Sequence, residues 1–272
     1  MSDWLLDPHL MRQRSGWTPA RVTLAQLIAL AAPVGVSLAE RGPAQIGVLA
    51  TALVTCLVWE LGFTLIRGRA LSWHTATVAL ILTVLVPETL PLWQVAMAAS
   101  FGVVFGELVF GGRGYGIVSG AAAAAGFLVF SFTGAGLATA SGAIALATLP
   151  GALLLLWGGL ISWRVLVSAG AVLIVFGLAR DAADSLLLVL TTAVFGLVFL
   201  VADPVAAAST QLGRLVYGVL AGVLIVLFDT IEGPAIAPAA IVFACLLASL
   251  FAPLIDYLDV KLAVRRREAR HG

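Results

Sequence analysis

The sequence predicts an all-α polytopic membrane protein, with about ten transmembrane helices in two inverted five-helix repeats that contain broken helices. Three observations carry this prediction. Hydrophobic residues make up 61% of the chain and charged residues 11%, whereas a soluble domain has about 45–50% apolar and about 25% charged residues. Apolar runs long enough to cross about 30 Å of hydrocarbon recur from Thr23 onward. Positive charge is nearly confined to alternate connections between these runs.

Ten apolar runs are separated by polar, proline-containing or glycine-containing connections. The third run is short and continues into "VPETLP", where Pro87 and Pro91 stop a helix. We expect spans at residues 23–39, 45–66, 74–86, 90–110, 115–132, 143–160, 165–179, 185–201, 215–230 and 238–255.

Lysine and arginine set the expected orientation, because cytoplasmic connections carry most of the positive charge of a membrane protein. With a cytoplasmic N-terminus, all but two of the 15 Lys and Arg residues fall inside, the exceptions being Arg41 and Arg180. An even number of spans then places both termini in the cytoplasm. The polar N-terminal segment leads into a full span without a cleavage site, which is not the plan of a secretory signal peptide.

The two halves of the chain resemble each other weakly. Residues 82–102 align with 198–218, and residues 116–130 with 234–248, mainly through small and apolar residues. Five spans per half is an odd number, so the second repeat must lie upside down relative to the first, as in many transporters. The expected organisation is a cytoplasmic segment (1–22), a first repeat (23–132), a short periplasmic segment (133–142), a second repeat (143–255) and a basic cytoplasmic tail (256–272).

The stretch "FLVADPVAAASTQLGRLVYG" interrupts the second repeat with an acid and a proline. Pro204 fits a first helical turn and Asp203 is a suitable N-cap beside it, which indicates a helix end followed by irregular backbone at membrane depth. Such backbone needs protein or water to satisfy its polar groups. The alternative is an ordinary cytoplasmic loop, which Ser209, Thr210 and Arg214 would also suit.

Four motifs, taken in order and at their spacing, resemble one protein family. They are "DPHLMRQRSGWTPARV", "LTVLVPETLPLWQVAMAASFGVVFGELVFGGRGYG", "ADPVAAASTQLGRLVYGVLAGVL" and "LFAPLIDYL". The chain is similar over nearly its whole length to the family of the B subunit of the sodium-pumping NADH:quinone oxidoreductase and the D subunit of the Rnf electron-transport complex. The resemblance implies a subunit of the bacterial inner membrane that carries flavin and passes electrons between periplasmic and membrane partners, the other membrane and redox subunits of an electron-transport complex. In some complexes of the family this electron transfer is coupled to sodium or proton movement.

The resemblance also implies an FMN-carrying threonine in a Ser-x-Ala-Thr context outside the membrane, and this chain departs from that pattern. Thr139 follows an alanine, but Gly136 stands at the serine position, no acid precedes it, and Ile144 has no hydroxyl. A noncovalent FMN or other flavin is therefore favoured over a covalent one. The candidate flavin-binding residues are Thr139, Gly136 and Ser141 outside, with Asp203, Ser209, Thr210 and Arg113 inside.

Glu60 and Glu107 lie within the second and fourth spans and are candidates for an ion path. An ionised carboxylate at a helix centre costs roughly 2.5–3.5 kcal/mol on insertion scales, so function is one interpretation and a partnered structural acid the other. The "GGRG" turn around Arg113 is either a phosphate-approach point or, more simply, a tight turn. The asparagines that the family has after this turn are absent from "GIVSGA", where Ser119 is the one hydroxyl.

Cysteine and histidine usage argues against a metal centre. Cys56 and Cys245 lie far apart in apolar runs and neither forms a CxxC pair, which indicates buried small hydrophobic residues. Among the three histidines only His74 lies near a span, so a haem held by two intramembrane histidines is not expected. The expected partners are the lipid bilayer and other subunits, and no nucleic acid.

Three functional classes remain open from the sequence. The first is a non-autonomous subunit of a flavin-dependent electron-transport translocase. The second is a cofactor-free ion or small-solute channel on the same scaffold. The third is a structural membrane anchor for redox partners. The electron donor and acceptor, the coupling ion and the stoichiometry do not follow from the sequence.

The charge distribution predicts the accessibility of the C-terminus. In intact cells a membrane-impermeant thiol reagent should not label the variant His271→Cys, because position 271 is expected to be cytoplasmic. The control is Thr139→Cys, which should be labelled because it lies in the expected periplasmic segment. Labelling of position 271 in intact cells would contradict the orientation.

Overall fold

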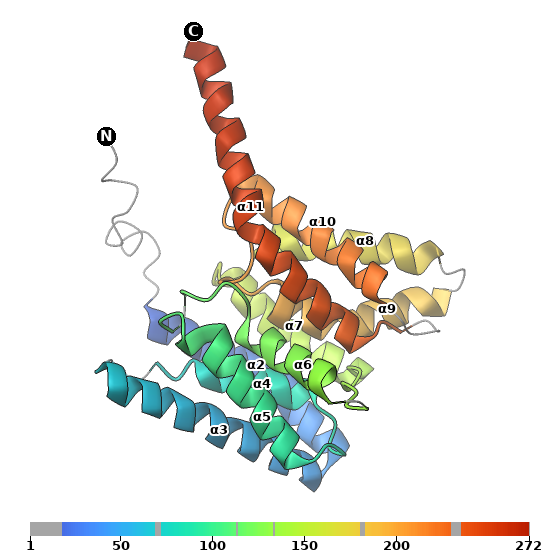
Figure 1. Cartoon of the computed structure of the whole chain (residues 1–272). Coiled ribbons are helices and arrows are strands. Elements are labelled where there is room, and N and C mark those ends of the chain that lie inside the picture. Colours follow the sequence, from blue (N-terminus) through green and yellow to red (C-terminus); the bar gives the residue numbers. More distant parts are fainter. Residues whose placement is uncertain are drawn as a thin grey trace.

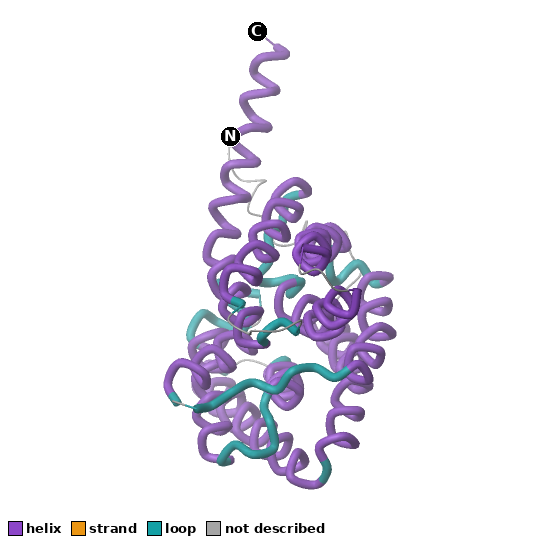
Figure 2. The backbone as a smooth tube through the Cα atoms, turned by 90° about the vertical axis from the view of Figure 1, so that its right-hand side faces the viewer, coloured by secondary structure: helices purple, strands orange, loops and turns teal. Residues whose placement is uncertain are grey.

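A computed structural model describes residues 18–68, 72–112, 114–132, 134–179, 183–229 and 235–271. These residues form ten helical rods and no strand, and Figures 1 and 2 show the rods packed as one bundle. Two rods, α5 and α9, end in a π-helical turn, η2 and η3 respectively. The elements are α2 (Pro19–Arg41), α3 (Pro43–Arg67), α4 (Thr75–Leu85), α5 (Leu92–Val103), η2 (Val104–Leu108), α6 (Gly120–Ser131), α7 (Gly142–Trp157), α8 (Trp163–Ala179), α9 (Ala183–Gly196), η3 (Leu197–Val201), α10 (Gln211–Phe228) and α11 (Pro238–His271).

The ten rods coincide with the ten apolar runs of the sequence, and the predicted fold class is confirmed. Four of the described helices, α2, α3, α10 and α11, are long and apolar enough to cross a membrane by themselves, and the other rods are shorter apolar helices. The 11 residues of α4 extend only about 16 Å. A helix this short needs non-helical backbone at its ends to complete a crossing of about 30 Å.

The helix contacts of the first half reappear in the second half. In the first half α3 packs on α4 and α5, and α5 packs on α6; in the second half α8 packs on α9 and α10, and α10 packs on α11. Helices α2 and α7 pack on each other, as do α6 and α11, so equivalent helices meet where the halves join. This is the arrangement of two repeats around a pseudo-two-fold axis.

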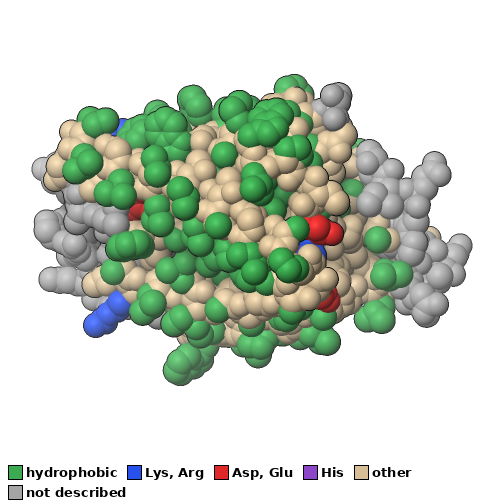
Figure 3. Space-filling model, turned by 90° about the horizontal axis from the view of Figure 1, so that it is seen from below, with side chains coloured by type: hydrophobic (Ala, Val, Ile, Leu, Met, Phe, Trp, Pro, Cys, Tyr) green, Lys and Arg blue, Asp and Glu red, His purple; other side chains and the backbone are tan. Residues whose placement is uncertain are grey.

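The outside of the bundle is apolar and the inside is built from small residues. Trp157 is 95% exposed and Phe130 is 86% exposed, values that suit lipid contact. Figure 3 shows hydrophobic side chains spread across one face with few charges among them. Inside, the five alanines from Ala121 to Ala125 on α6 are all buried. Small residues let helix backbones approach closely where no hydrophobic effect drives association.

The contact between α5–η2 and α6 depends on glycine. A Cβ at Gly102 would overlap the Gly120 carbonyl oxygen, and one at Gly106 would lie 2.6 Å from the Gly120 Cα. A Cβ at Gly116 would overlap the Gly106 carbonyl oxygen. No side chain fits at these positions, so glycine allows the backbones to touch.

Side chains of α2 and α3 satisfy the backbone at the C-terminal end of α4. Gln45 is fully buried, and its Nε2 donates to the carbonyl oxygens of Thr83 and, at 3.0 Å, Val86. Arg41 Nη1 donates to the Val84 and Val86 carbonyls at 2.9 and 3.1 Å. The helix therefore ends at Leu85 with its last carbonyl groups hydrogen-bonded, although Pro87 follows.

The last helix is longer than the sequence prediction. It runs without interruption from Pro238 to His271 and projects beyond the bundle in Figure 1. The residues expected to form a separate basic tail therefore continue the final span as helix. The assignment of connections to the cytoplasmic or periplasmic side stays a prediction.

Candidate functional site

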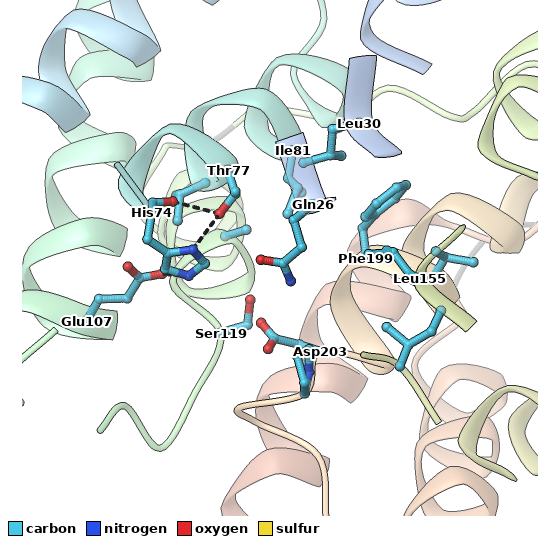
Figure 4. A pocket seen from close by; sticks show the side chains of 15 residues that line it. Gln26, Leu30, His74, Thr77, Ile81, Glu107, Ser119, Leu155, Phe199 and Asp203 are labelled. Atoms are coloured by element: carbon cyan, nitrogen blue, oxygen red, sulfur yellow. Dashed lines mark hydrogen bonds and ion pairs between the residues drawn. The ribbon is translucent and has the colours of Figure 1, made fainter. Parts of the chain in front are cut away.

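A polar cavity of about 20 Å³ lies between the two halves, at their expected cytoplasmic side. Its polar lining residues come from several separate places in the chain. They are Gln26 on α2, His74 and Thr77 at the start of α4, Glu107 on η2, Ser119 before α6 and Asp203 after η3. Figure 4 shows Gln26, Ser119 and Asp203 pointing toward a common space, with the His74–Glu107 pair beside it. The volume suits about one water molecule.

A second cavity of about 10 Å³ adjoins the same polar residues. It is lined by the glycine-rich connection between η2 and α6 and by Val205, and it shares four residues with the first cavity. The shared residues are His74, Glu107, Ser119 and Asp203. These four side chains therefore stand between two small spaces.

The side chains of His74 and Glu107 form a close pair inside the bundle. The distance from His74 Nε2 to Glu107 Oε1 is 3.4 Å, and each residue is only 8% exposed. The other ring nitrogen, Nδ1, lies 3.3 Å from Thr77 Oγ1, and the Thr77 hydroxyl donates to the His74 carbonyl at 2.7 Å. The ring is thereby held on both sides, as Figure 4 shows.

The backbone around η2 places Glu107 against α6. A Cβ on Gly120 would come within 2.9 Å of Glu107 Oε1, so the carboxylate lies directly over this glycine. Arg67 of α3 donates to the carbonyl of Leu108 and, at 3.4 Å, to that of Val109. These bonds satisfy backbone acceptors where the rod ends. A π-turn inside a helix is frequent at functional sites.

Asp203 ends the rod formed by α9 and η3 and opens one turn of irregular backbone. Its Oδ1 accepts a hydrogen bond from the Val205 amide at 2.9 Å, and its carbonyl accepts from the Ala207 amide at 3.0 Å. Asp203 therefore caps the turn that begins with Pro204, as the sequence suggests. It also borders both cavities, which a simple surface loop would not do.

Glu60 lies outside the cavity and holds the entry to α4. Its Oε1 accepts from the Ser72 amide, the Ser72 hydroxyl and the Trp73 amide, each at 2.8 Å, and its Oε2 accepts from the Thr75 hydroxyl. Trp73 has a φ of 59°, a backbone conformation that is uncommon for a bulky residue. The carboxylate therefore stabilises a strained turn. The structure places it as a partnered acid, and its role in an ion path stays a prediction.

Asp256 accepts hydrogen bonds from the residues that precede α10, as Glu60 does from the residues that lead into α4. It accepts from the amide and the hydroxyl of Ser209, both at 2.8 Å, and from those of Thr210, at 3.0 and 2.8 Å. The hydroxyl of Thr210 also caps α10 by accepting from the Gly213 amide at 3.1 Å. Both hydroxyl groups proposed as inner flavin contacts are thus already engaged by the protein.

The outer candidates lie apart from this cavity. Thr139 and Gly136 are exposed in the connection between α6 and α7. Ser141 caps α7 by accepting from the Ile144 amide, and its hydroxyl donates to both Glu40 oxygens at 2.9 and 2.8 Å. Arg113 lies outside the described residues.

The described residues do not fit a flavin at either candidate place. Ligand pockets occupy about 300–1,000 Å³, whereas the cavity at Asp203 holds about 20 Å³. A groove of about 390 Å³ between α5, α6 and α11 is large enough, but its lining side chains are phenylalanine and aliphatic residues. They offer no hydrogen-bonding side chain for the polar edge of a flavin. Thr139 and Gly136 are exposed at the surface.

The opposite side of the bundle has a counterpart of the polar cavity, with different chemistry. This cavity of about 10 Å³ is lined by the end of α4, by α9, by η3 and by the start of α11. Thr192 is its one side chain with a hydrogen-bonding group, and this hydroxyl already accepts from the Ile236 amide at 3.1 Å. The repeat thus supplies two related cavities, and the one at the expected cytoplasmic side carries the charged groups.

Sequence reasoning does not identify His74 or Gln26 as part of the site. It brings His74 to notice only as a possible haem ligand, and Gln26 only as part of the first span. The available signal is the shortness of the third span, because a short helix leaves its first residues at membrane depth. An imidazole in that position needs a partner, and Glu107 provides it.

The fold and the site define a class of protein: an internally repeated, polytopic membrane protein with a small charged cavity between its halves. The family follows from comparison with known proteins. A model of the NQR2, RnfD, RnfE family matches residues 6–141 and residues 135–264. The chain belongs to this family, as its resemblance predicted, and the two matched segments correspond to its two halves.

Curated relatives carry the name of the B subunit of Na(+)-translocating NADH-quinone reductase. The relative from Haemophilus influenzae (strain PittEE) is 31% identical, over 79% of this chain and 66% of its own length. Those from Klebsiella pneumoniae (strain 342) and Chromohalobacter salexigens are 30% and 31% identical, each over 78% of this chain and over 65% and 64% of their own lengths. The chain thus spans just under two thirds of these relatives. The apolar helices of this chain and the bacterial sources of its relatives support a protein of the bacterial inner membrane.

The hydrogen bonds of Asp256 predict a local change in backbone protection. In Asp256→Ala, the amides of Ser209 and Thr210 should exchange with solvent about tenfold faster or more, because hydrogen bonds to a charged group contribute about 1.5–3 kcal/mol. Amide-resolved hydrogen exchange on the purified protein measures this. Asp259→Ala, on the same helix, is the control and should leave both amides unchanged. Equal exchange in wild type and Asp256→Ala would show that the carboxylate does not hold this segment.

Proposed function

We propose that this chain is the membrane subunit of a bacterial electron-transport complex and that its polar cavity is part of the route by which the complex takes up its coupling ion. The observation that carries the ion route is the His74–Glu107 pair, buried between two small cavities at the junction of the halves. Membership of the NQR2, RnfD, RnfE family supports the electron-transport assignment.

The hydrogen bonds of the other acids support this choice of Glu107. Glu40, Glu60, Asp229 and Asp256 each accept hydrogen bonds from residues that lead into a helix. Their charges stabilise local backbone. The Glu107 carboxylate instead faces an imidazole and two cavities. A buried carboxylate that contributes to no cap is costly, so it is a functional candidate.

A second function, ion or small-solute transport without a cofactor, is favoured by one observation. The polar cavity at Asp203, of about 20 Å³, is too small for a flavin. In that case the chain would move its ion without redox subunits. A purely structural anchor is the third class, and it would not require a buried histidine–glutamate pair.

Flavin and redox partners belong to the proposal. A flavin supplies electron-transfer chemistry when it is bound, and none of the contacts described above assigns it a place in this chain. We propose that a bound flavin is held without a covalent link, because the context of Thr139 lacks the serine and the acid. The partners we propose are the membrane and redox subunits that complete the complex.

Glu107→Gln is expected to separate ion movement from assembly. The tagged variant should copurify with the same redox subunits as wild type. Electron-transfer-driven ion movement in vesicles should fall at least tenfold, because a neutral amide neither binds a proton nor balances the charge of a cation. NADH-dependent quinone reduction, the reaction in the relatives' name, is the first activity to assay. Glu88→Gln is the matched control, since Glu88 is exposed at the other end of the bundle.

The outcomes separate the three functions. Wild-type chain that copurifies with no redox subunit, and whose deletion leaves membrane electron transfer intact, would reject the electron-transport assignment. Ion flux through liposomes that contain this chain alone would support the cofactor-free transporter. Unchanged ion movement in Glu107→Gln would show that the cavity is not on the path.

The expected form of flavin attachment is tested by denaturation. Protein that is denatured in acid and separated on a gel should show no flavin fluorescence at its own mass. Covalent attachment needs a threonine hydroxyl within a sequence that a flavin transferase recognises, and the residues around Thr139 depart from that sequence. Mass measurement of the intact protein gives the same information independently. A fluorescent band that disappears in Thr139→Ala would show that the flavin is covalently attached at that residue.

A further inference from the structure

We propose that the His74–Glu107 pair is a proton-binding site, so that the ion taken up at the cavity is a proton. The inference deepens the proposed ion route and rests on it for its physiological role. The site itself is defined by geometry: a ring nitrogen and a carboxylate oxygen 3.4 Å apart, each on a residue that is 8% exposed, with a cavity on either side.

The hydrogen bonds of Thr77 fix which nitrogen of His74 is free to exchange its proton. A hydroxyl has one proton to donate. Thr77 Oγ1 donates it to the His74 carbonyl at 2.7 Å, so at Nδ1, 3.3 Å away, the hydroxyl oxygen is the acceptor. Nδ1 therefore carries a hydrogen in either charge state of the ring. Nε2, which faces Glu107, is the nitrogen that gains or loses a proton.

One proton between Nε2 and Glu107 Oε1 gives two arrangements with the same total charge. Either the ring is charged beside a carboxylate, or a neutral ring accepts from a carboxylic acid. The first is favoured by the attraction of opposite charges in a site of low dielectric constant. The second is favoured by burial and by the N-terminal end of α4, whose partial positive charge opposes a cation at His74. In both arrangements the two atoms share one proton.

The groups around the pair form a path along which a proton can reach the pair and leave it. Asp203, on the connection after η3, borders both cavities and is a second carboxylate. Gln26 of α2 adds an uncharged amide to the larger cavity. The proton step then balances simply. A water in the smaller cavity takes up one proton from the expected cytoplasmic side as it gives one to the pair, so the water stays neutral while the charge of the pair rises from −1 to zero. The pair later passes that proton toward Asp203 through the larger cavity.

The donor set favours a proton over a hard metal cation. Hard cations take oxygen ligands, whereas an imidazole nitrogen suits softer metals or protons. Here the closest partner of the carboxylate is an imidazole, and a charged imidazole would repel a cation at Glu107. The larger cavity of about 20 Å³ suits about one water, which can relay a proton without leaving its place.

Nitrogen-15 NMR of the purified full chain with labelled histidine tests the site without any electron transfer. The chain has three histidines, so three pairs of ring signals are expected, and His74→Gln assigns one pair. We expect a permanently protonated Nδ1 and an Nε2 signal between its protonated and unprotonated values. In Glu107→Gln the Nε2 signal should move to the unprotonated value, because an amide shares no proton with it. Thr77→Val should change Nδ1 instead, and Glu88→Gln should change neither.

Replacement of K⁺ by Na⁺ tests whether the site binds sodium instead of a proton. Exchange of K⁺ for Na⁺ at constant pH should leave the His74 signals in place, and vesicles that contain the whole complex should move protons in sodium-free medium. An Nε2 signal that ignores Glu107→Gln would overturn the shared proton. Signals that follow Na⁺ concentration would assign the site to sodium. Either result would stand whether or not the chain proves to be an electron-transport subunit, because the NMR readout needs no redox partner.

Discussion

The absence of water in the hydrocarbon core is the constraint on which this structure depends, because every backbone group that leaves a helix there must bond to protein. The chain meets it with side chains from neighbouring helices. Glu60 holds the entry to α4, Gln45 and Arg41 hold its end, and Asp256 holds the entry to α10. These contacts permit a helix as short as α4 inside the bundle. They also show that Glu60 and Asp256 already accept hydrogen bonds from the residues that precede a helix.

The repeat creates two related cavities, and their difference in polarity makes the two sides of the bundle unequal. The cavity at the expected cytoplasmic side has His74, Glu107 and Asp203, whereas its counterpart is lined by apolar residues and Thr192. Charged side chains therefore line the first of these two cavities and not the second. Passage to the other side would require the halves to rearrange around the packed contacts of α2 with α7 and α6 with α11, as repeats do in alternating access.

The sequence predicts the ten helices well because apolar length and charge bias act over whole spans and do not depend on tertiary detail. The break at Asp203 follows from its proline for the same local reason. The site is less predictable. Glu107 is found by its charge, but its pairing with His74 joins residues that lie on different helical rods. Likewise, nothing local distinguishes Glu60, which caps a turn, from Glu107, which faces a cavity. That difference arises from which backbone amides lie nearby.

The position of Glu107 is set by glycine and by the π-turn together. Gly102, Gly106 and Gly120 bring the two backbones so close that the carboxylate lies over Gly120. Each residue of an α-helix turns the chain by about 100°, and the wider π-turn at Val104–Leu108 changes the direction of the residues that follow. A regular α-helix through this segment would give Glu107 a different direction. The position of the Glu107 carboxylate thus depends on two uncharged features, the glycines that lack a Cβ atom and one π-helical turn.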